Sequence, residues 1–325
     1  MAGQSTAVLA EPSRIGAVAA PPRRKPGVRR RIGSRWYTPY LFILPHFVVF
    51  ATFIGWPFLL GFWISLHDWN FFNEVQPWVG LDNFAAVLNP DDFYGELFYR
   101  SLRNTVVFVL MSTPPLVLIG LGLAALLNGK YRGRTAFRAI FLSPWTLSVA
   151  VVGLLWWFLF NGTIGPIGLL IESVGFEPPP WLTANPWAWI SITTATVWWT
   201  VGFNTIILLA GMQSISPQLY EAAAIDGAGR WQQFVRITVP LLRPVLLLVI
   251  TLQIIAGFNL FGQPQLMTGG GPPTAQTTPV QLYVFQLING TNPRLGIAAA
   301  VLILTSFVVG IISVVSFRLL RTERA

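Results

Sequence analysis

Six long apolar stretches, separated by polar loops, divide the sequence. Each stretch holds the roughly 20 residues that an α-helix needs to cross a hydrocarbon core about 30 Å thick. The pattern therefore predicts an all-α integral membrane protein with six transmembrane helices. The predicted spans cover approximately residues 39–66, 102–127, 139–160, 186–211, 241–262 and 295–317.

Composition supports a membrane protein and argues against a soluble one. Hydrophobic residues make up 54% of the chain and charged residues 10%, whereas soluble domains carry about a quarter charged residues. A net charge of +9 also occurs in proteins that bind nucleic acid, so the distribution of the charge decides between the two classes. Most basic residues lie in the tails and loops on one side of the predicted spans, which predicts contact with lipid and no nucleic-acid partner.

Six crossings place both termini on one side of the membrane. Most Lys and Arg residues lie before the first span, after the last, and in the loops that follow spans two and four; the other side holds Arg100, Arg103 and Arg294 beside most of the acids. Loops rich in Lys and Arg stay in the cytoplasm, so both termini are predicted to be cytoplasmic. Residues 1–35 are predicted to form a basic, disordered tail against anionic lipid, with a dedicated partner as the alternative, and residues 36–325 the six-helix transmembrane domain.

Side chains for catalysis and for ion coupling are missing from the predicted spans. Ion-coupled carriers need a carboxylate inside the bilayer, and every Asp and Glu falls in a predicted loop or tail. Lys25 and Lys130 do not lie in a phosphate-binding loop, and the chain has no Cys and only two His residues. We therefore predict no catalytic residue, no metal site and no bound cofactor. The chain is then either a passive pore or a transporter driven by another protein.

The loop between spans four and five predicts two short helices. In the first, Ser216 is a suitable N-cap, Pro217 suits the first helical position, and Gly227 can close the helix in the left-handed conformation. The second is predicted over about residues 229–239, where Pro240 interrupts it. The two helices form a compact projection that the groove of another protein can accept. A surface hairpin that only links two spans is the alternative.

The same loop resembles a known motif. Permease subunits of binding-protein-dependent ATP-binding-cassette (ABC) importers carry an "EAA" loop, which the chain reproduces in Glu221-Ala222-Ala223, Asp226-Gly227-Ala228, Phe234, Ile237, Pro240 and Pro244. The resemblance implies the ABC importer permease fold, with residues 213–240 as the coupling loop that docks into a separate ATPase. It implies that the residues in contact with the ATPase are Glu221, Ala222, Ala223, Asp226, Gly227 and Ala228. Gly227 is then the residue that sets the bend.

Further segments resemble carbohydrate-uptake permeases of the maltose and glycerol-phosphate type: Gly80-Leu81-Asp82-Asn83-Phe84, Asn104-Thr105, Phe137-Arg138 before Leu142 and Pro144-Trp145, and Gly269-Gly270-Gly271-Pro272. The resemblance implies import of a sugar, oligosaccharide, polyol or glycerol phosphate across a bacterial inner membrane. It also implies three kinds of partner: a second permease, ABC ATPase subunits that bind ATP and Mg, and an extracytoplasmic solute-binding protein. The chain itself is then no enzyme. It lacks the extra helices and large outer domain of the maltose-type subunit, which argues against maltose as the solute.

Aromatic and amide side chains in spans four and five are candidates for the solute path. Sugars are commonly held by aromatic faces and amides, and amides inside a membrane are costly unless they are satisfied. The candidates are Trp199, Asn204, Gln253, Phe258 and Asn259, with Trp198 beside them. On an unbroken helix Asn259 lies about 120° from Gln253, so both line one site only if the helix distorts. Alternatively, the amides join helices and the tryptophans anchor the spans at the membrane interface.

Two other functional classes fit the same pattern of spans. A passive channel or an ion-coupled secondary transporter is the first, and a membrane scaffold without transport is the second. Small residues at helical spacing, Gly120 with Ala124 and the run 296–300, predict close association between helices in the bilayer.

Overall fold

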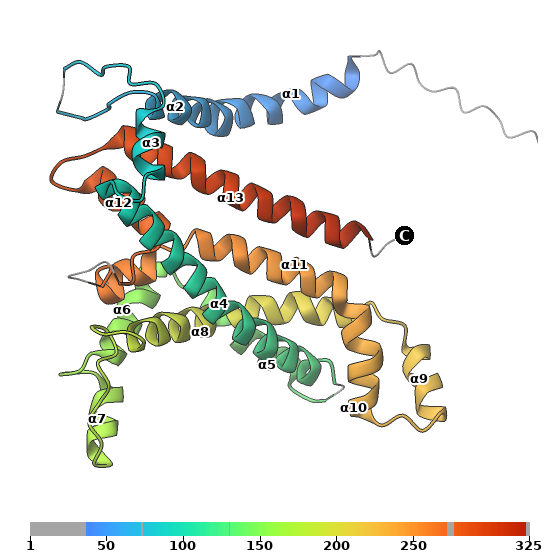
Figure 1. The fold of residues 1–325 in the computed structure, drawn as a ribbon. Helices are drawn as coiled ribbons and strands as arrows, with labels where there is room; N and C mark the ends of the chain where they lie inside the picture. Colours follow the sequence, from blue (N-terminus) through green and yellow to red (C-terminus); the bar gives the residue numbers. More distant parts are fainter. Residues whose placement is uncertain (1–36, 73, 130, 272–275, 323–325) are drawn as a thin grey trace, which may run out of the picture. The chain divides into compact units, whose positions relative to one another are not determined.

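The computed structural model describes residues 37–72, 74–129, 131–271 and 276–322 (Figure 1). The predicted tail, 1–35, lies outside these ranges. Contacts divide the chain into two compact units, Met1–Trp56 and Pro57–Ala325, which we describe separately.

The first unit contains α1 (Thr38–Phe50) and a π-helical turn, η1 (Ala51–Gly55). With α2 (Trp56–Ser65) they form the candidate span Pro39–Ser65, whose most apolar stretch buries no residue. Phe42 is 82% exposed and Phe53 is 73% exposed. Such a continuous apolar surface suits contact with lipid or with another membrane helix.

The regular elements described in the second unit are helices, and one isolated antiparallel bridge joins His67 to Trp78. The unit contains α3 (Asp82–Leu88), α4 (Phe93–Leu127), α5 (Arg134–Leu142), a 3-10 turn η2 (Ser143–Thr146), α6 (Val149–Phe160), α7 (Pro166–Ser173), α8 (Trp187–Gln213), α9 (Pro217–Ile225), α10 (Arg230–Gln233), a π turn η3 (Phe234–Thr238), α11 (Val239–Phe258), a π turn η4 (Pro264–Thr268), α12 (Val280–Asn289) and α13 (Leu295–Thr322).

The structure confirms six candidate spans among the described residues, provided that one bent pair counts as a span. Five helices are long and apolar enough to cross a membrane, and the pair α5–η2 and α6 meets the same test together with a bend of 95°. The predicted third span, 139–160, is therefore broken. Pro144 is the second residue of the 3-10 turn, Leu147 is extended, and Ser148 caps the start of α6 by accepting a hydrogen bond from the Val151 N–H.

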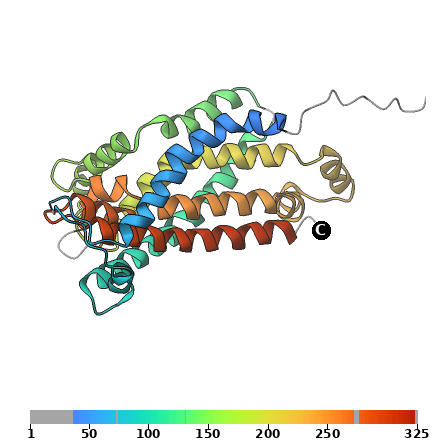
Figure 2. The ribbon, with the colours of Figure 1, turned by 90° about the horizontal axis from the view of Figure 1, so that it is seen from above.

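Helix α8 forms the centre of the second unit. It packs against α4, α5, α6 and α11, and α11 also packs against α13. Figures 1 and 2 show α8, α11 and α13 side by side, crossed by α4. The predicted small-residue contacts form within this chain: Gly120 and Ala124 are buried, a Cβ on Gly120 meets Leu208 and Asn204, and 296–300 is also buried. These small residues therefore pack against other helices of the same chain.

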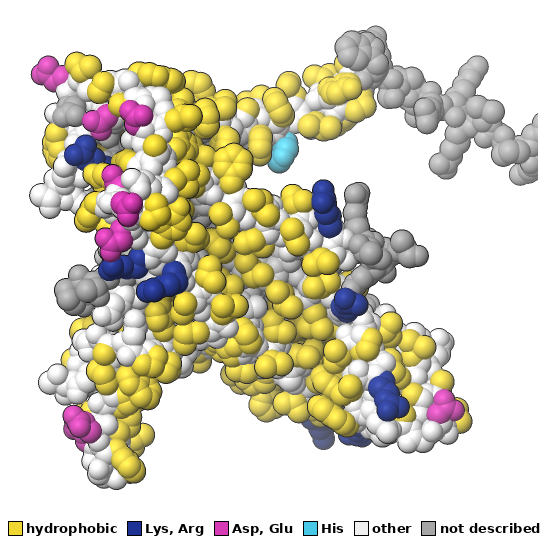
Figure 3. All heavy atoms as spheres, viewed as in Figure 1, with side chains coloured by type: hydrophobic (Ala, Val, Ile, Leu, Met, Phe, Trp, Pro, Cys, Tyr) yellow, Lys and Arg dark blue, Asp and Glu magenta, His cyan; other side chains and the backbone are white. Residues whose placement is uncertain are grey.

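Charged side chains separate toward the two ends of the second unit. Figure 3 shows Lys and Arg at both ends, whereas most Asp and Glu lie at the end with α3, α7 and α12, away from α9 and α10. This arrangement is consistent with the predicted orientation, in which the end that carries α9 faces the cytoplasm.

Candidate functional site

The predicted coupling loop, residues 213–240, projects from one end of the bundle as the short helix α9 followed by α10 (Figure 1). Pro217 occupies the first turn of α9, as predicted, and Ser216 is the N-cap residue. The Ser216 side chain, however, makes no cap hydrogen bond; its hydroxyl donates to Oε1 of Gln218 over 2.9 Å. The start of the helix is thus set by proline, which has no N–H to satisfy.

Gly227 ends α9 in the left-handed conformation that the sequence predicts, with φ of +80°. The Ala228 N–H donates to the Ala223 carbonyl over 2.8 Å, and the Gly227 N–H donates to the Ala224 carbonyl over 3.1 Å. This pair of bonds is a Schellman closure, which satisfies carbonyls at the helix end and turns the chain sharply. The turn directs the chain into α10.

Hydrogen bonds fix α9 against the helical segment that follows. The Tyr220 and Thr238 hydroxyls share a hydrogen bond of 2.9 Å. The Gln233 side-chain amide donates to the carbonyls of Ala228, over 3.0 Å, and Tyr220, over 3.4 Å. Because these bonds join Tyr220 of α9, and Ala228 just after it, to residues of α10 and η3, the projection can move as one body.

The outer surface of the projection is exposed and partly apolar. No residue of α9 is buried, and Glu221, Ala222 and Asp226 are among its exposed side chains or caps. Ile225 is 87% exposed and Trp231 is 74% exposed. Large apolar side chains so exposed beside charged ones are typical of a surface that another protein covers.

A groove of about 410 Å³ lies between the two arms of the projection. It is lined by Ala223, Asp226, Gly227, Ala228, Gln232, Gln233, Arg236 and Ile237. Four of the six predicted ATPase-facing residues thus line one concave surface, while Glu221 and Ala222 are exposed on α9. The projection therefore offers both a ridge and a groove to a partner.

The prediction that Pro240 interrupts the second helix is wrong. Helical residues run from Arg230 through η3 to Phe258 and form one candidate span. Pro240 falls in the first turn of α11, directly after the π turn, and a π turn changes the hydrogen-bond register enough to accept a proline there. Figure 1 shows that α10 nevertheless leaves the axis of α11.

Two of the predicted solute-path amides meet near the middle of the bundle. The Gln253 side-chain amide on α11 donates to Oδ1 of Asn204 on α8 over 2.9 Å. Asn204 is 1% exposed, and its Nδ2 has no hydrogen-bond partner among the described residues. Gln253 is half-buried. The amides thus join two helices, as the alternative interpretation held, but one buried donor remains unsatisfied.

This contact should contribute measurably to stability. We expect Gln253→Leu to destabilise the protein by about 1–3 kcal/mol, because it leaves the buried Asn204 amide without any partner. The double variant Asn204→Leu/Gln253→Leu should recover part of that loss, since it removes both polar groups. Melting temperatures of the detergent-solubilised protein, measured for the single and double variants, check the coupling. A double variant whose loss equals the sum of the single losses would contradict it.

A second cluster, of aromatic rings, lies at the break in span three. Trp145 stacks on Phe203 with centroids 4.8 Å apart, and it lies 5.5 Å from Trp199. The Trp199 indole N–H donates to the Leu147 carbonyl over 3.2 Å, which satisfies backbone in the non-helical link. Non-helical backbone at membrane depth is tolerated where protein buries it or where it lines a water-filled cavity. This aromatic cluster is therefore a second candidate for the solute path.

The candidates for the solute path that were chosen from the sequence did not include Trp145 or Phe203. The available signal was Pro144 inside an apolar stretch, because a proline there can end a helix. Trp199 and Asn204 lie five residues apart, or about 140° around α8. The structure therefore separates the aromatic cluster from the amide pair.

The other predicted solute-path residues lie apart from both groups. Phe258 is the last residue of α11 and is only 5% exposed. Asn259 is the exposed C-cap, and its side chain donates to the Ile255 carbonyl over 2.8 Å. Trp198 contacts Trp156 in an edge-on arrangement, away from Trp145. Among the described residues, no group of three or more His, Cys, Asp or Glu could hold a metal ion.

Comparisons with known proteins match most of the chain. The family model described as "Binding-protein-dependent transport system inner membrane component" matches residues 93–322. The trehalose/maltose transport system permease protein MalF of Thermococcus litoralis is 37% identical over 282 residues, which cover 86% of this chain and 94% of that protein. The sn-glycerol-3-phosphate transport system permease protein UgpA of Salmonella typhi is 34% identical over 294 residues, with 89% and 96% covered.

A solved structure has the same fold. A chain in the crystal structure of a bacterial ABC transporter that imports the acidic polysaccharide alginate superposes with a TM-score of 0.72 at 26% identity. The match covers 88% of this chain and 96% of that chain.

Proposed function

Because the chain belongs to the family of inner membrane components of binding-protein-dependent transport systems, we propose that it moves a carbohydrate or a polyol derivative through the membrane when a separate ATPase drives its coupling loop. The chain is a multi-pass permease of the inner membrane. Family membership decides against a passive channel, an ion-coupled carrier and a scaffold. The partners that we propose are a second permease, ABC ATPase subunits that hold ATP and Mg, and a solute-binding protein outside the cytoplasm.

The observation that carries the coupling role is the rigid, exposed projection at the end of the bundle. Its hydrogen bonds fix α9 to the segment that becomes α11, and its outer face exposes Ile225 and Trp231. A partner that closes on this projection can displace α11 as a rigid body. We assign ATPase contact to the ridge with Glu221 and Ala222 and to the groove lined by Ala223, Asp226, Gly227 and Ala228.

The proposed solute class is taken from the relatives and from the aromatic cluster. The similar proteins are named for trehalose and maltose, sn-glycerol 3-phosphate and alginate, which are sugars or polyol derivatives. The length of this chain does not argue against maltose, because 94% of the relative named for it aligns here. Exposed aromatic rings such as Trp145 suit the apolar faces of sugars.

The proposed solute path passes the break between η2 and α6. Trp145 is 40% exposed, and Trp199 is half-buried beside it. Gln253, also half-buried, is paired with Asn204 apart from this cluster and stays a separate candidate, whereas the burial of Phe258 favours a packing role. Asn259 and Asn204 act here as helix cap and as interhelical partner.

The test is reconstitution of this permease in proteoliposomes with its second permease, its ATPase and its binding protein. Uptake of radiolabelled maltose, trehalose and sn-glycerol 3-phosphate is measured with and without ATP. We expect ATP-dependent uptake of at least one of the three, and no uptake when the ATPase is left out. Uptake that continues without the ATPase would contradict the proposal.

The solute path has its own test. We expect Trp199→Ala to raise the KM for uptake about fivefold, because one aromatic contact contributes about 1 kcal/mol. Trp198→Ala is the matched control, since Trp198 faces Trp156 instead, and it should leave KM unchanged. The ATPase rate without solute should be the same in both variants. Equal KM values for the two variants would place the path elsewhere.

A further inference from the structure

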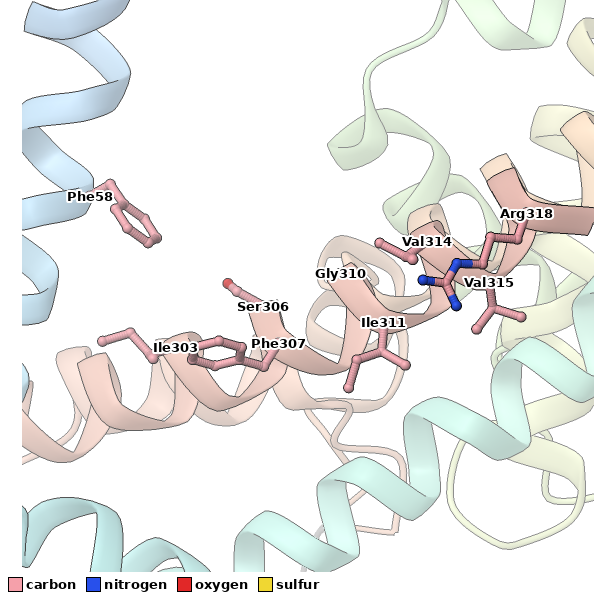
Figure 4. Close-up of a pocket in the computed structure, with 9 residues that line it drawn as sticks. All are labelled: Phe58, Ile303, Ser306, Phe307, Gly310, Ile311, Val314, Val315 and Arg318. Atoms are coloured by element: carbon pink, nitrogen blue, oxygen red, sulfur yellow. The ribbon is translucent and has the colours of Figure 1, made fainter. Parts of the chain in front are cut away.

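An apolar groove runs along the exposed face of α13 toward its C-terminal end (Figure 4). Its volume is about 660 Å³, and its lining residues are Phe58, Ile303, Ser306, Phe307, Gly310, Ile311, Val314, Val315 and Arg318. Phe58 on α2 forms the opposite wall, facing α13 across the groove. Phe307 is 67% exposed and Ile311 is 65% exposed. A face this apolar must be covered by lipid or protein within the membrane.

The part of the groove between Phe307 and Arg318 has the length of one lipid leaflet. Phe307 and Arg318 are eleven residues apart, which is about 16 Å along a helix that rises 1.5 Å per residue. Half of a hydrocarbon core about 30 Å thick is about 15 Å. A chain that starts level with Arg318 therefore ends near Phe307, close to the middle of the bilayer.

Arg318 is the one charged residue in the lining. It lies at the end of α13 that is predicted to face the cytoplasm, and Figure 4 shows its side chain reaching back along the helix toward the groove. Lys and Arg side chains near a helix end extend their charge to the headgroup region while their stems cover apolar surface. A guanidinium at this depth matches a lipid phosphate.

We propose that this groove binds one anionic phospholipid of the cytoplasmic leaflet, with its phosphate against Arg318 and an acyl chain along Val314, Ile311 and Phe307. The lining selects for a lipid because it joins a bulky apolar surface to a cation at the interface. Ser306 and Gly310 are spaced as in close-packed helix pairs, so a membrane helix from another subunit is the competing occupant. The bulky side chains around them favour a flexible acyl chain. This inference does not depend on the proposed transport function.

The experiment is a lipid titration of the purified, delipidated full chain by native mass spectrometry. The probes are phosphatidylglycerol and phosphatidylcholine with identical acyl chains. We expect a single tight site that prefers phosphatidylglycerol. Arg318→Gln should weaken phosphatidylglycerol binding about fivefold, the effect of one cation at a membrane surface. Arg318→Lys keeps the charge and should keep the preference.

Gly310→Leu tests the acyl-chain part of the site. A Cβ on Gly310 meets nothing within 4 Å, so leucine fills the groove without disturbing the helix and should weaken binding of both lipids. Two controls lie outside the lining: Arg243→Gln on α11, and Gly61→Leu on α2, where a Cβ also meets nothing within 4 Å. Both should bind lipid as the unchanged protein does.

Two results would overturn the proposal. The first is equal affinity of the unchanged protein for the two lipids, with no effect of Arg318→Gln. The second is a Gly310→Leu variant that binds lipid normally but no longer copurifies with a second membrane subunit, because the groove would then seat a helix.

Discussion

Gly227→Pro should abolish uptake and leave the amount of permease in the membrane unchanged. Gly227 has φ of +80°, whereas proline fixes φ near −65° and has no N–H. The variant therefore loses both the left-handed turn and the hydrogen bond to the Ala224 carbonyl. The spans are unaffected, because a side chain at residue 227 meets nothing within 4 Å. Uptake assays on membrane vesicles, together with immunoblots of the same membranes, measure the two effects.

Gly229→Ala is the matched control, two residues along the same loop. Gly229 has φ of −68°, and a Cβ there also meets nothing within 4 Å, so alanine should preserve uptake. Uptake by Gly227→Ala should lie between the uptake of these two variants, because a non-glycine residue in the left-handed region costs about 1–2 kcal/mol. Uptake by Gly227→Pro at the unchanged level would show that the bend has no part in coupling.

Gly202→Leu should destabilise the second unit strongly. A Cβ on Gly202 would lie 1.9 Å from the Phe141 carbonyl oxygen, so α8 approaches α5 backbone to backbone. Leucine forces the two apart, which breaks the bond from Trp199 to Leu147 and the stacking of Trp145 on Phe203. Overpacking usually costs about 1–3 kcal/mol, and a clash with backbone belongs at the upper end. Thermal unfolding in detergent, followed by tryptophan fluorescence, measures the loss.

The control for this variant is Gly122→Leu. Gly122 lies within the span α4, but a Cβ there meets nothing within 4 Å, so the added side chain should be tolerated. An unchanged melting temperature for Gly202→Leu would mean that α5 and α8 do not approach as closely as described.

The spans and the helix closure at Gly227 could be predicted because each depends on residues that are close together in the sequence. Apolar length identifies a span without knowledge of its partners, and so all six spans were found. The bend at Gly227 was found for the same reason, since helix closure depends on a few consecutive residues.

Features that depend on contacts between distant residues were not predictable in this way. The break after Pro144 is stabilised by Trp199, 52 residues away from the carbonyl that it satisfies. The pairing of Gln253 with Asn204 spans 49 residues. The sequence shows that each amide needs a hydrogen-bond partner inside the membrane, but it does not show whether that partner is a solute or the other amide. Pro240 was misjudged because a preceding π turn is invisible in the pattern of apolar residues.

The helical run from Arg230 to Phe258 joins the proposed coupling loop directly to span five. At its start, Gln233 donates a hydrogen bond to the Tyr220 carbonyl of α9. Further along, Gln253 donates one to Asn204 on α8. A displacement of α10 would therefore either be absorbed at the π turn η3 or be passed along α11 to the contact between Gln253 and Asn204. Because Nδ2 of the same Asn204 side chain has no hydrogen-bond partner among the described residues, a shift of α11 would change the surroundings of a buried, unsatisfied donor.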